Sequence, residues 1–292
     1  MGAGKTAPWT VLRLLNWTGE HFAKAGLDSP RLCAEVLLAH ALRCQRIELY
    51  TRFEYIPRPQ ELDGFREMVR RAAAREPVAY LVGYKEFYSL RFKVTPDVLV
   101  PRPETEILAS EAIGRLRGLG RPGLVWDVCT GSGCIAVAIA SQSPDATVLA
   151  TDISPAAVAV AQENAGAHKV DSRVRCRVAD LLSLPADCAD LRDFDAITGN
   201  PPYVPDADEV SPEVGHEPVL ALRAGPDGLS FLRRVIQSAG PLLRSGGAMV
   251  LEFGCGQADA VRDLIVATGR FAEPKVLRDH RHIERAVVAQ RA

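Results

Sequence analysis

From residue 123 to the C-terminus, short apolar segments alternate with segments of helical spacing, and this alternation constrains the fold more than any other feature. Strand-like segments cover 123–130, 146–154, 174–182, 194–200, 247–254 and 284–291, and helix-like segments cover 134–142, 155–165, 229–243 and 257–269. Single helices between successive strands require parallel crossover connections, which place helices on both faces of the sheet. The sequence therefore predicts an α/β fold with a Rossmann-like, doubly wound sheet.

The region before this alternation is predicted to be a small helical bundle. Apolar positions recur at helical spacing in two sets: Val11, Leu14, Leu15, Thr18 and Phe22, then Leu62, Phe65, Val69 and Ala72. Between them, Ser29 is a candidate N-cap, because Pro30 suits the first position of a helix. We expect a helical domain over 1–88, a linker or short strand pair over 89–100, and the α/β domain over 101–292.

Composition excludes several classes of protein. No apolar run reaches the roughly 18 residues of a membrane helix, and "MGAGKTAPWT" lacks the apolar region of a secretory signal. Seven cysteines without a CxxC pair indicate reduced thiols and a cytoplasmic location, and His280 and His282 lack a third partner for a metal. The net charge is −1, with +5 through Thr95 and −6 after it, so no nucleic-acid partner is expected.

The segment "DVCTGSGCIAVAI" places glycines where the first strand of the sheet meets its first helix. Glycines let a ligand approach the backbone closely, and a helix N-terminus offers free N–H groups, although "GSGCIA" alone is a weak motif. Asp127, Asp152 and Asp180 lie at the ends of three successive strands, and Asp152 is placed to accept both hydroxyls of a ribose. Together these features predict a site for a ribose-bearing cofactor.

The charge of Asp127 bears on which cofactor this is. A pyrophosphate is disfavoured beside a carboxylate, whereas S-adenosyl-L-methionine carries a positive ammonium and a positive sulfonium. The sequence therefore favours S-adenosyl-L-methionine over NAD. An NAD-dependent oxidoreductase is an alternative, but no hydride-transfer residue is evident.

The stretch "GNPPYVPD", residues 199–206, follows the fourth predicted strand. Its two prolines have a fixed φ and no N–H, so they form a rigid turn at the edge of the sheet where ligands bind. The side-chain oxygen of Asn200 and the carbonyl of Pro201 can then accept both hydrogens of one planar NH₂ group, which positions the nitrogen and stabilises its growing charge. Pro202 keeps the turn rigid and Tyr203 can stack on the flat group, so Asn200, Pro201, Pro202 and Tyr203 are the predicted catalytic residues.

These motifs resemble those of the class I S-adenosylmethionine-dependent methyltransferases, specifically the peptide chain release factor glutamine methyltransferases (PrmC, historically HemK). The resemblance also rests on "AGLDSPRLCAEVLLAHAL", "EPVAYLVGYKEFYSLRFKVTPDVLVPRPETE", "ATDISPAAVAVAQENA", "HEPVLALRAGPDGLSFL" and "LEFGCGQ". It implies methylation of the side-chain amide nitrogen of glutamine in the Gly-Gly-Gln motif of class 1 release factors, which modulates translation termination. It also implies that the helical domain recognises the release factor.

The resemblance also assigns roles to individual residues. It implies that Cys129, Thr130, Gly131, Ser132 and Gly133 wrap the methionine part of the cofactor, that Asp152 holds the ribose, that Asp180 and Leu181 flank the adenine, and that Asn200, beside the cofactor, holds the glutamine with Pro201, Pro202 and Tyr203. Three positions depart from the family pattern: Cys129 and His282 stand where glycine is common, and Leu181 stands where an aromatic residue is common.

Two other acceptors remain open. A sister family methylates glutamine in ribosomal protein L3 and shares NPPY, but it differs at the segment matching "PRPETE". An adenine-N6 nucleic-acid methyltransferase can use the same pair of acceptors, but it must extract a base and grip phosphates, for which this near-neutral chain is poorly suited. The expected enzyme is a monomer without metal.

Overall fold

The computed structural model describes residues 8–292, which form two compact units. The first unit consists of the described residues up to Gly83 together with Ser211–His216, and the second consists of Tyr84–Val210 and Glu217–Ala292. The sequence predicts a helical domain over 1–88, whereas the first unit ends at Gly83 and includes Ser211–His216. The first ten residues were expected to lack a secretory signal, but residues 1–7 lie outside the residues that the structure describes.

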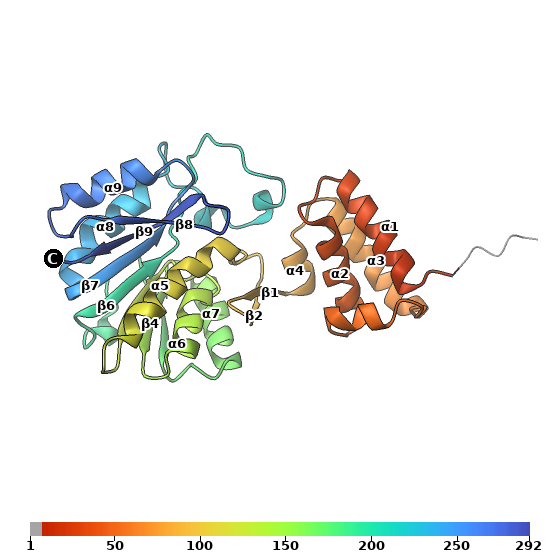
Figure 1. Ribbon diagram of the computed structural model, residues 1–292, viewed down its shortest axis with the longest axis horizontal. Coiled ribbons are helices and arrows are strands. Elements are labelled where there is room, and N and C mark those ends of the chain that lie inside the picture. The colour runs from red at the N-terminus through yellow and green to blue at the C-terminus, as the bar shows by residue number, and fades with distance from the viewer. Residues whose placement is uncertain (1–7) are drawn as a thin grey trace, which may run out of the picture. The chain divides into compact units, whose positions relative to one another are not determined.

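The first unit is helical (Figure 1). Its α-helices are α1 (Val11–Lys24), α2 (Pro30–Ala41), α3 (Pro59–Ala73) and α4 (Val78–Val82), with a 3₁₀ helix at Arg46–Thr51. The buried residues of α1 are the five of the predicted stripe, which confirms that prediction. Ser29 is the N-cap residue of α2 and Pro30 is its first residue, as predicted, but Ser29 has a φ of +51° and its side chain makes no capping hydrogen bond. Arg75, after α3, forms an ion pair with Glu213 at 2.6 Å, which ties the short segment Ser211–His216 into this unit.

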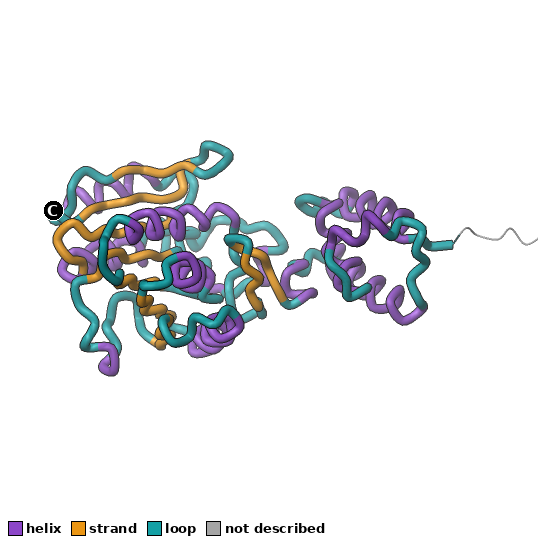
Figure 2. The backbone as a smooth tube through the Cα atoms, turned by 60° about the horizontal axis from the view of Figure 1, so that its bottom comes forward, coloured by secondary structure: helices purple, strands orange, loops and turns teal. Residues whose placement is uncertain are grey.

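The second unit contains a seven-stranded sheet in the order β5-β4-β3-β6-β7-β9-β8 (Figures 1 and 2). The strands are β3 (Leu124–Val128), β4 (Thr147–Asp152), β5 (Val174–Val178), β6 (Phe194–Gly199), β7 (Leu243–Glu252), β8 (Lys275–Arg278) and β9 (Glu284–Gln290). The first five of these pair in parallel, whereas β9 is antiparallel to both β7 and β8. The predicted α/β doubly wound class is confirmed, with β8 as a strand that the sequence analysis did not predict.

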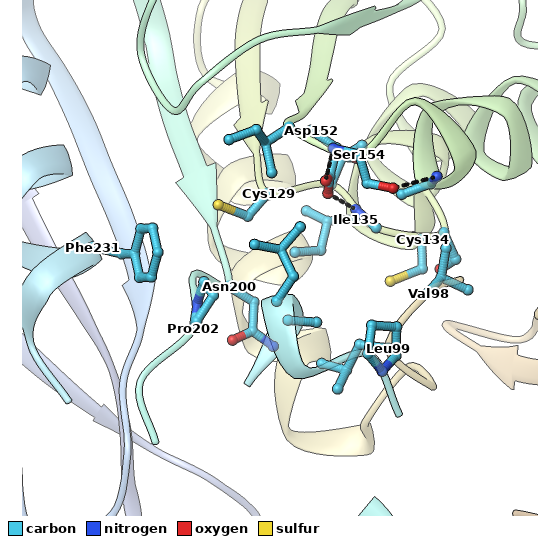
Figure 3. A pocket seen from close by; sticks show the side chains of 18 of the residues that line it. Val98, Leu99, Cys129, Cys134, Ile135, Asp152, Ser154, Asn200, Pro202 and Phe231 are labelled. Atoms are coloured by element: carbon cyan, nitrogen blue, oxygen red, sulfur yellow. Dashed lines mark hydrogen bonds between the residues drawn. The ribbon is translucent and has the colours of Figure 1, made fainter. Parts of the chain in front are cut away.

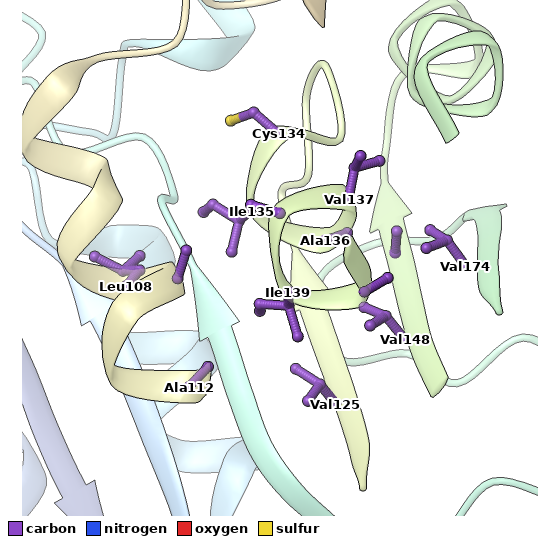
Figure 4. Packing of buried hydrophobic residues seen from close by; sticks show 14 of the residues in the cluster. Leu108, Ala112, Val125, Cys134, Ile135, Ala136, Val137, Ile139, Val148 and Val174 are labelled. Carbon is purple, nitrogen blue, oxygen red and sulfur yellow. The ribbon is translucent and has the colours of Figure 1, made fainter. Parts of the chain in front are cut away.

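Helices cover both faces of this sheet (Figure 1). They are α5 (Glu106–Arg117), α6 (Cys134–Gln142) and α7 (Pro155–Ala167) on one face, and α8 (Ser230–Leu242) and α9 (Ala258–Ala267) on the other. Each face of the sheet has its own hydrophobic core: the first core lies under α5, α6 and α7, and the second core lies under α8 and α9. Because side chains alternate along a strand, Val125 packs in the first core and Trp126 packs in the second core. Figure 4 shows Leu108 and Ala112 of α5 and Ile139 of α6 gathered near Val125.

A two-stranded hairpin precedes the sheet, formed by β1 (Tyr84–Phe87) and β2 (Leu90–Lys93). Its last residue is bound to α7, because the side-chain oxygen of Asn164 accepts a hydrogen bond from the Lys93 N–H at 2.8 Å. The Asn164 amide nitrogen donates to the Lys93 carbonyl at 3.0 Å and to the Ser132 carbonyl at 2.8 Å. One buried side chain therefore joins the hairpin, α7 and the glycine turn.

Candidate active site

The glycine turn connects β3 to α6. Its backbone has positive φ at Cys129 (+55°), Gly131 (+53°) and Gly133 (+78°), so three residues adopt the left-handed conformation that glycine adopts most easily. A Cβ on Gly133 would lie 3.0 Å from the Cβ of Ala161, so glycine is needed there for close packing on α7. The Thr130 N–H donates to the Thr151 carbonyl at 2.9 Å, which holds the turn against the end of β4.

Asp152, the last residue of β4, accepts two backbone hydrogen bonds. Its Oδ2 accepts from the Gly131 N–H at 2.9 Å, and its Oδ1 accepts from the Ser154 N–H at 3.0 Å. Burial raises the pKa of Asp152, and the hydrogen bonds from Ser154 and Gly131 oppose that shift. Each carboxylate oxygen keeps a lone pair, so Asp152 can still accept hydroxyl groups from a ligand.

Asp127 is placed differently from the sequence expectation. It is 0% exposed and does not line the cavity; its carboxylate accepts from the hydroxyls of Thr130 at 2.5 Å and Thr198 at 2.8 Å. Burial raises its pKa to about 7, against the lowering effect of these two hydrogen bonds. Asp127 therefore does not face a bound cofactor and does not select its charge by direct contact; instead it joins the glycine turn to β6.

A cavity of about 220 Å³ opens at the carboxyl ends of these strands (Figure 3). Of the predicted site residues, its wall includes Cys129, Thr130, Gly131, Ser132, Asp152, Asp180, Leu181, Asn200 and Pro202. Gly133, Pro201 and Tyr203 are not part of the wall. Figure 3 shows Phe231 on one side of the cavity and Val98 and Leu99 on the other, with Asn200 and Cys129 between them.

The wall near Asp180 has two residues that the sequence analysis missed, Phe231 and Arg234 of α8. Arg234 donates to Asp180 Oδ2 at 2.7 Å. Residues three apart share one face of a helix, so this ion pair also brings Phe231 to the cavity. The segment "LSFLRR" gave only the spacing of an amphipathic helix, and no local signal separates its cavity-facing residues from its core residues.

The NPPY turn begins directly after β6, which neighbours β3 in the sheet. The amide nitrogen of Asn200 donates to Thr105 Oγ1 at 3.4 Å. Pro201 and Pro202 are buried, and Tyr203 packs beside the second core and donates its hydroxyl hydrogen bond to Glu252 Oε1 at 3.2 Å. The predicted stacking face of Tyr203 is thus outside the cavity wall, and its hydroxyl is directed to a buried carboxylate.

Contacts outside the cavity wall also hold the NPPY turn in position. Gln257 donates from Nε2 to the Tyr203 carbonyl at 3.0 Å and accepts from the Gly254 N–H at 2.8 Å. Gly199 is required by the close approach of β6 to β3, because a Cβ there would lie 2.6 Å from Cγ2 of Val128. These contacts fix where Asn200 leaves the strand.

Within residues 8–292, no helix combines the length and the apolar character needed to span a membrane. The same part of the chain has no group of three or more His, Cys, Asp or Glu side chains arranged to hold a metal ion.

Known proteins share both parts of this chain. Residues 13–83 match the model of the PrmC N-terminal domain, and residues 108–225 match that of the methyltransferase small domain. A release factor glutamine methyltransferase of Rhodopirellula baltica is 44% identical over 98% of this chain and 97% of its own length, and one of Geobacter sulfurreducens is 41% identical over 96% of each. A solved methyltransferase structure from Pyrococcus furiosus shares the fold, with a TM-score of 0.51, 16% identity, and coverage of 76% of this chain and 98% of that one. At this identity over nearly the full length, the chain belongs to the release factor glutamine methyltransferase family.

Proposed function

We propose that this enzyme transfers a methyl group from S-adenosyl-L-methionine to the side-chain amide nitrogen of the glutamine in the Gly-Gly-Gln motif of class 1 peptide chain release factors. Family membership supports the reaction class, since the relatives carry that activity in their names. The observation that carries the proposal is the position of Asn200, which lines the same cavity as Asp152 and the glycine turn.

The cavity suits the proposed cofactor. Asp152 has carboxylate oxygens free to accept ribose hydroxyls, and its position is held by two backbone N–H groups. Leu181 and Phe231 offer apolar surface for a flat base near Asp180. The turn from Cys129 to Ser132 lines the cavity, so a bound cofactor can lie close to its backbone. When bound, S-adenosyl-L-methionine supplies a methyl group on a positively charged sulfur.

Asn200 and Pro201 act on the glutamine. The Oδ1 of Asn200 and the carbonyl of Pro201 accept the two N–H hydrogens of the substrate amide, which holds the nitrogen in place. The nitrogen forms its new bond to the methyl carbon as the bond from that carbon to sulfur breaks, with the electron pair staying on sulfur. Positive charge thus passes from sulfur to the nitrogen, where both oxygens stabilise it. The nitrogen then loses one proton to water, so this reaction needs no strong general base.

The other parts of the proposal concern the protein substrate. The helical domain recognises the release factor outside the Gly-Gly-Gln motif, and the enzyme acts in the cytoplasm as a monomer. Neither a nucleic acid nor a membrane takes part. Sedimentation of the enzyme alone and with release factor tests the monomer and the complex.

The test is incubation of the purified enzyme with labelled S-adenosylmethionine and, in parallel, a class 1 release factor, ribosomal protein L3 and DNA. Peptide mass mapping identifies the labelled residue, and we expect label on the Gly-Gly-Gln glutamine alone. Label on L3 or on adenine would support one of the two alternative acceptors instead.

The same assay tests Asn200. We expect N200A to lose transfer by at least about 100-fold, the effect of removing one charge-stabilising group, while calorimetry still detects cofactor binding. Turnover of N200A at the wild-type rate would contradict the role of its side-chain oxygen.

A further inference from the structure

Two segments of the family pattern have no part in the reaction as described so far, "PRPETE" (101–106) and "LEFGCGQ" (251–257). The structure brings them together inside the second unit. Thr105 donates its hydroxyl hydrogen bond to Glu252 Oε2 at 2.6 Å, across 147 residues of sequence. Thr105 is 3% exposed and Glu252 is 0% exposed, so water does not compete for this contact.

This buried pair contacts two residues of the NPPY turn. The Asn200 amide nitrogen lies 3.4 Å from Thr105 Oγ1, and the Tyr203 hydroxyl lies 3.2 Å from Glu252 Oε1. The first contact is long for a hydrogen bond, so it adds little rigidity by itself. The importance of this contact lies in orientation, because the NH₂ end of the Asn200 carboxamide faces Thr105.

We propose that Glu252, acting through the hydroxyl of Thr105, orients the Asn200 carboxamide, and that Thr105 and Glu252 are positioning residues for methyl transfer. An ionised carboxylate can only accept hydrogen bonds, so the single Thr105 proton must point to Glu252. A lone pair of Thr105 then faces Asn200 and can pair only with the NH₂ end of its amide. The Oδ1 of Asn200 is thereby left for the substrate, so this inference rests on the proposed function.

Protonation of Glu252 removes this constraint. A neutral carboxyl can donate to Thr105, which frees the Thr105 proton to point to Asn200 and to pair with Oδ1 instead. The charged and titratable groups around Glu252 are Tyr203, Glu104, Arg285 and Cys134. Burial raises the pKa of the Cys134 thiol to about 12, so Cys134 stays uncharged near neutral pH. Burial raises the pKa of Glu252 to about 7, the Glu104 charge adds to the rise, and Thr105, Tyr203 and Arg285 oppose it. The change in orientation therefore falls in the neutral pH range.

The first experiment tests the hydroxyl of Thr105 separately from the size of its side chain. T105V keeps the shape and loses the hydroxyl, whereas T105S keeps the hydroxyl. With release factor and labelled S-adenosylmethionine, we expect T105V to lower kcat by about 10- to 100-fold, as expected for a misplaced contact to the reacting group. The dissociation constant for S-adenosylmethionine should stay within about two-fold, and T105S should retain most of the turnover.

The matched control is T18V, which also replaces a buried threonine but whose Oγ1 has no hydrogen-bond partner in the described structure. We expect T18V to turn over like the wild type. Wild-type kcat in T105V would overturn the inference, and so would a T105S enzyme as slow as T105V. If the wild-type enzyme itself fails to label release factor, the proposed function has failed instead.

The second experiment measures how kcat depends on the charge of Glu252. For the wild type we expect kcat to rise between about pH 6 and pH 8 as Glu252 ionises, and for E252Q we expect a lower kcat without that rise. The control is D195N, because Asp195 is a buried carboxylate paired with Arg121 and Arg244 at the opposite end of β6. D195N should lose stability but keep the wild-type pH profile. An unchanged pH profile in E252Q would overturn the role of the carboxylate.

Discussion

Asp152 accepts a hydrogen bond from the backbone N–H of Gly131 at 2.9 Å, so the acid at the end of β4 holds the glycine turn that follows β3. In the proposed function Asp152 both shapes the turn and accepts ribose hydroxyls, so replacing it removes two contributions to cofactor binding. We expect D152A to weaken S-adenosylmethionine binding by about 10- to 100-fold, corresponding to the loss of hydrogen bonds to a charged group. Isothermal titration calorimetry measures this directly.

The control for this change is D145A, because Asp145 is an exposed acid in the turn before β4. D145A should bind the cofactor like the wild type. Equal affinities of D152A and the wild type would contradict the placement of the ribose.

Phe231 is expected to contribute to cofactor binding by contact with the adenine, because it lines the cavity near Asp180 and Leu181. Removing an aromatic partner of a base costs about 1–3 kcal/mol. F231A should therefore weaken S-adenosylmethionine binding by about 5- to 150-fold, while F231L should recover part of the loss through apolar contact. F271L is the control, because Phe271 packs on the same core outside the cavity wall. Unchanged calorimetric affinity in F231A would place the adenine elsewhere.

Asp127 should make stability depend on pH. Its folded pKa is about 7 and an unfolded aspartate titrates near 4, so between these values the folded protein holds a proton that the unfolded chain has released. The contribution of Asp127 to the free energy of unfolding therefore falls as pH rises through this range. D127N can keep bonds to Thr130 and Thr198 and cannot ionise. We expect its free energy of unfolding, relative to wild type, to rise by more than about 1 kcal/mol between pH 5 and pH 8.

Urea unfolding at several pH values measures this difference. D259N is the control, because Asp259 is an exposed acid of α9 and should leave the pH dependence unchanged. A D127N-minus-wild-type difference that is independent of pH would show that Asp127 does not titrate in this range.

His282 occupies the turn between β8 and β9 with a φ of +62°, a conformation that costs a side chain with a Cβ about 1–2 kcal/mol. Glycine adopts this conformation without that strain, although it has more freedom to lose on folding. We expect H282G to raise the free energy of unfolding by about 1 kcal/mol, with a higher Tm. His280, an exposed neighbour without positive φ, gives the control, and H280G should lower stability or leave it unchanged. A less stable H282G would show that the imidazole contributes more than the strain removes.

The continuous apolar segments were predicted well. The helix-like segment 134–142 corresponds to α6 at both ends, and the strand-like segments 123–130 and 146–154 contain β3 and β4. By contrast, β8 is only four residues long, and two of the four are charged. Its position as a strand depends on pairing with β9, which the local sequence does not indicate. Helix α5 was also missed, because no helix or strand was predicted between residues 107 and 122.

The sequence by itself determined the alternation of strands and helices, the glycine turn and the presence of NPPY after a buried strand, because each depends on residues close together in the chain. Only the tertiary structure decided that Asp127 is a buried acceptor outside the cavity, that Phe231 lines the cavity, and that Thr105 contacts both Glu252 and Asn200. Such contacts join residues far apart in sequence, and their distances and burial follow from how the strands and helices pack. A local pattern can name the chemical groups of a site, but packing sets which of them meet and which of them water can reach.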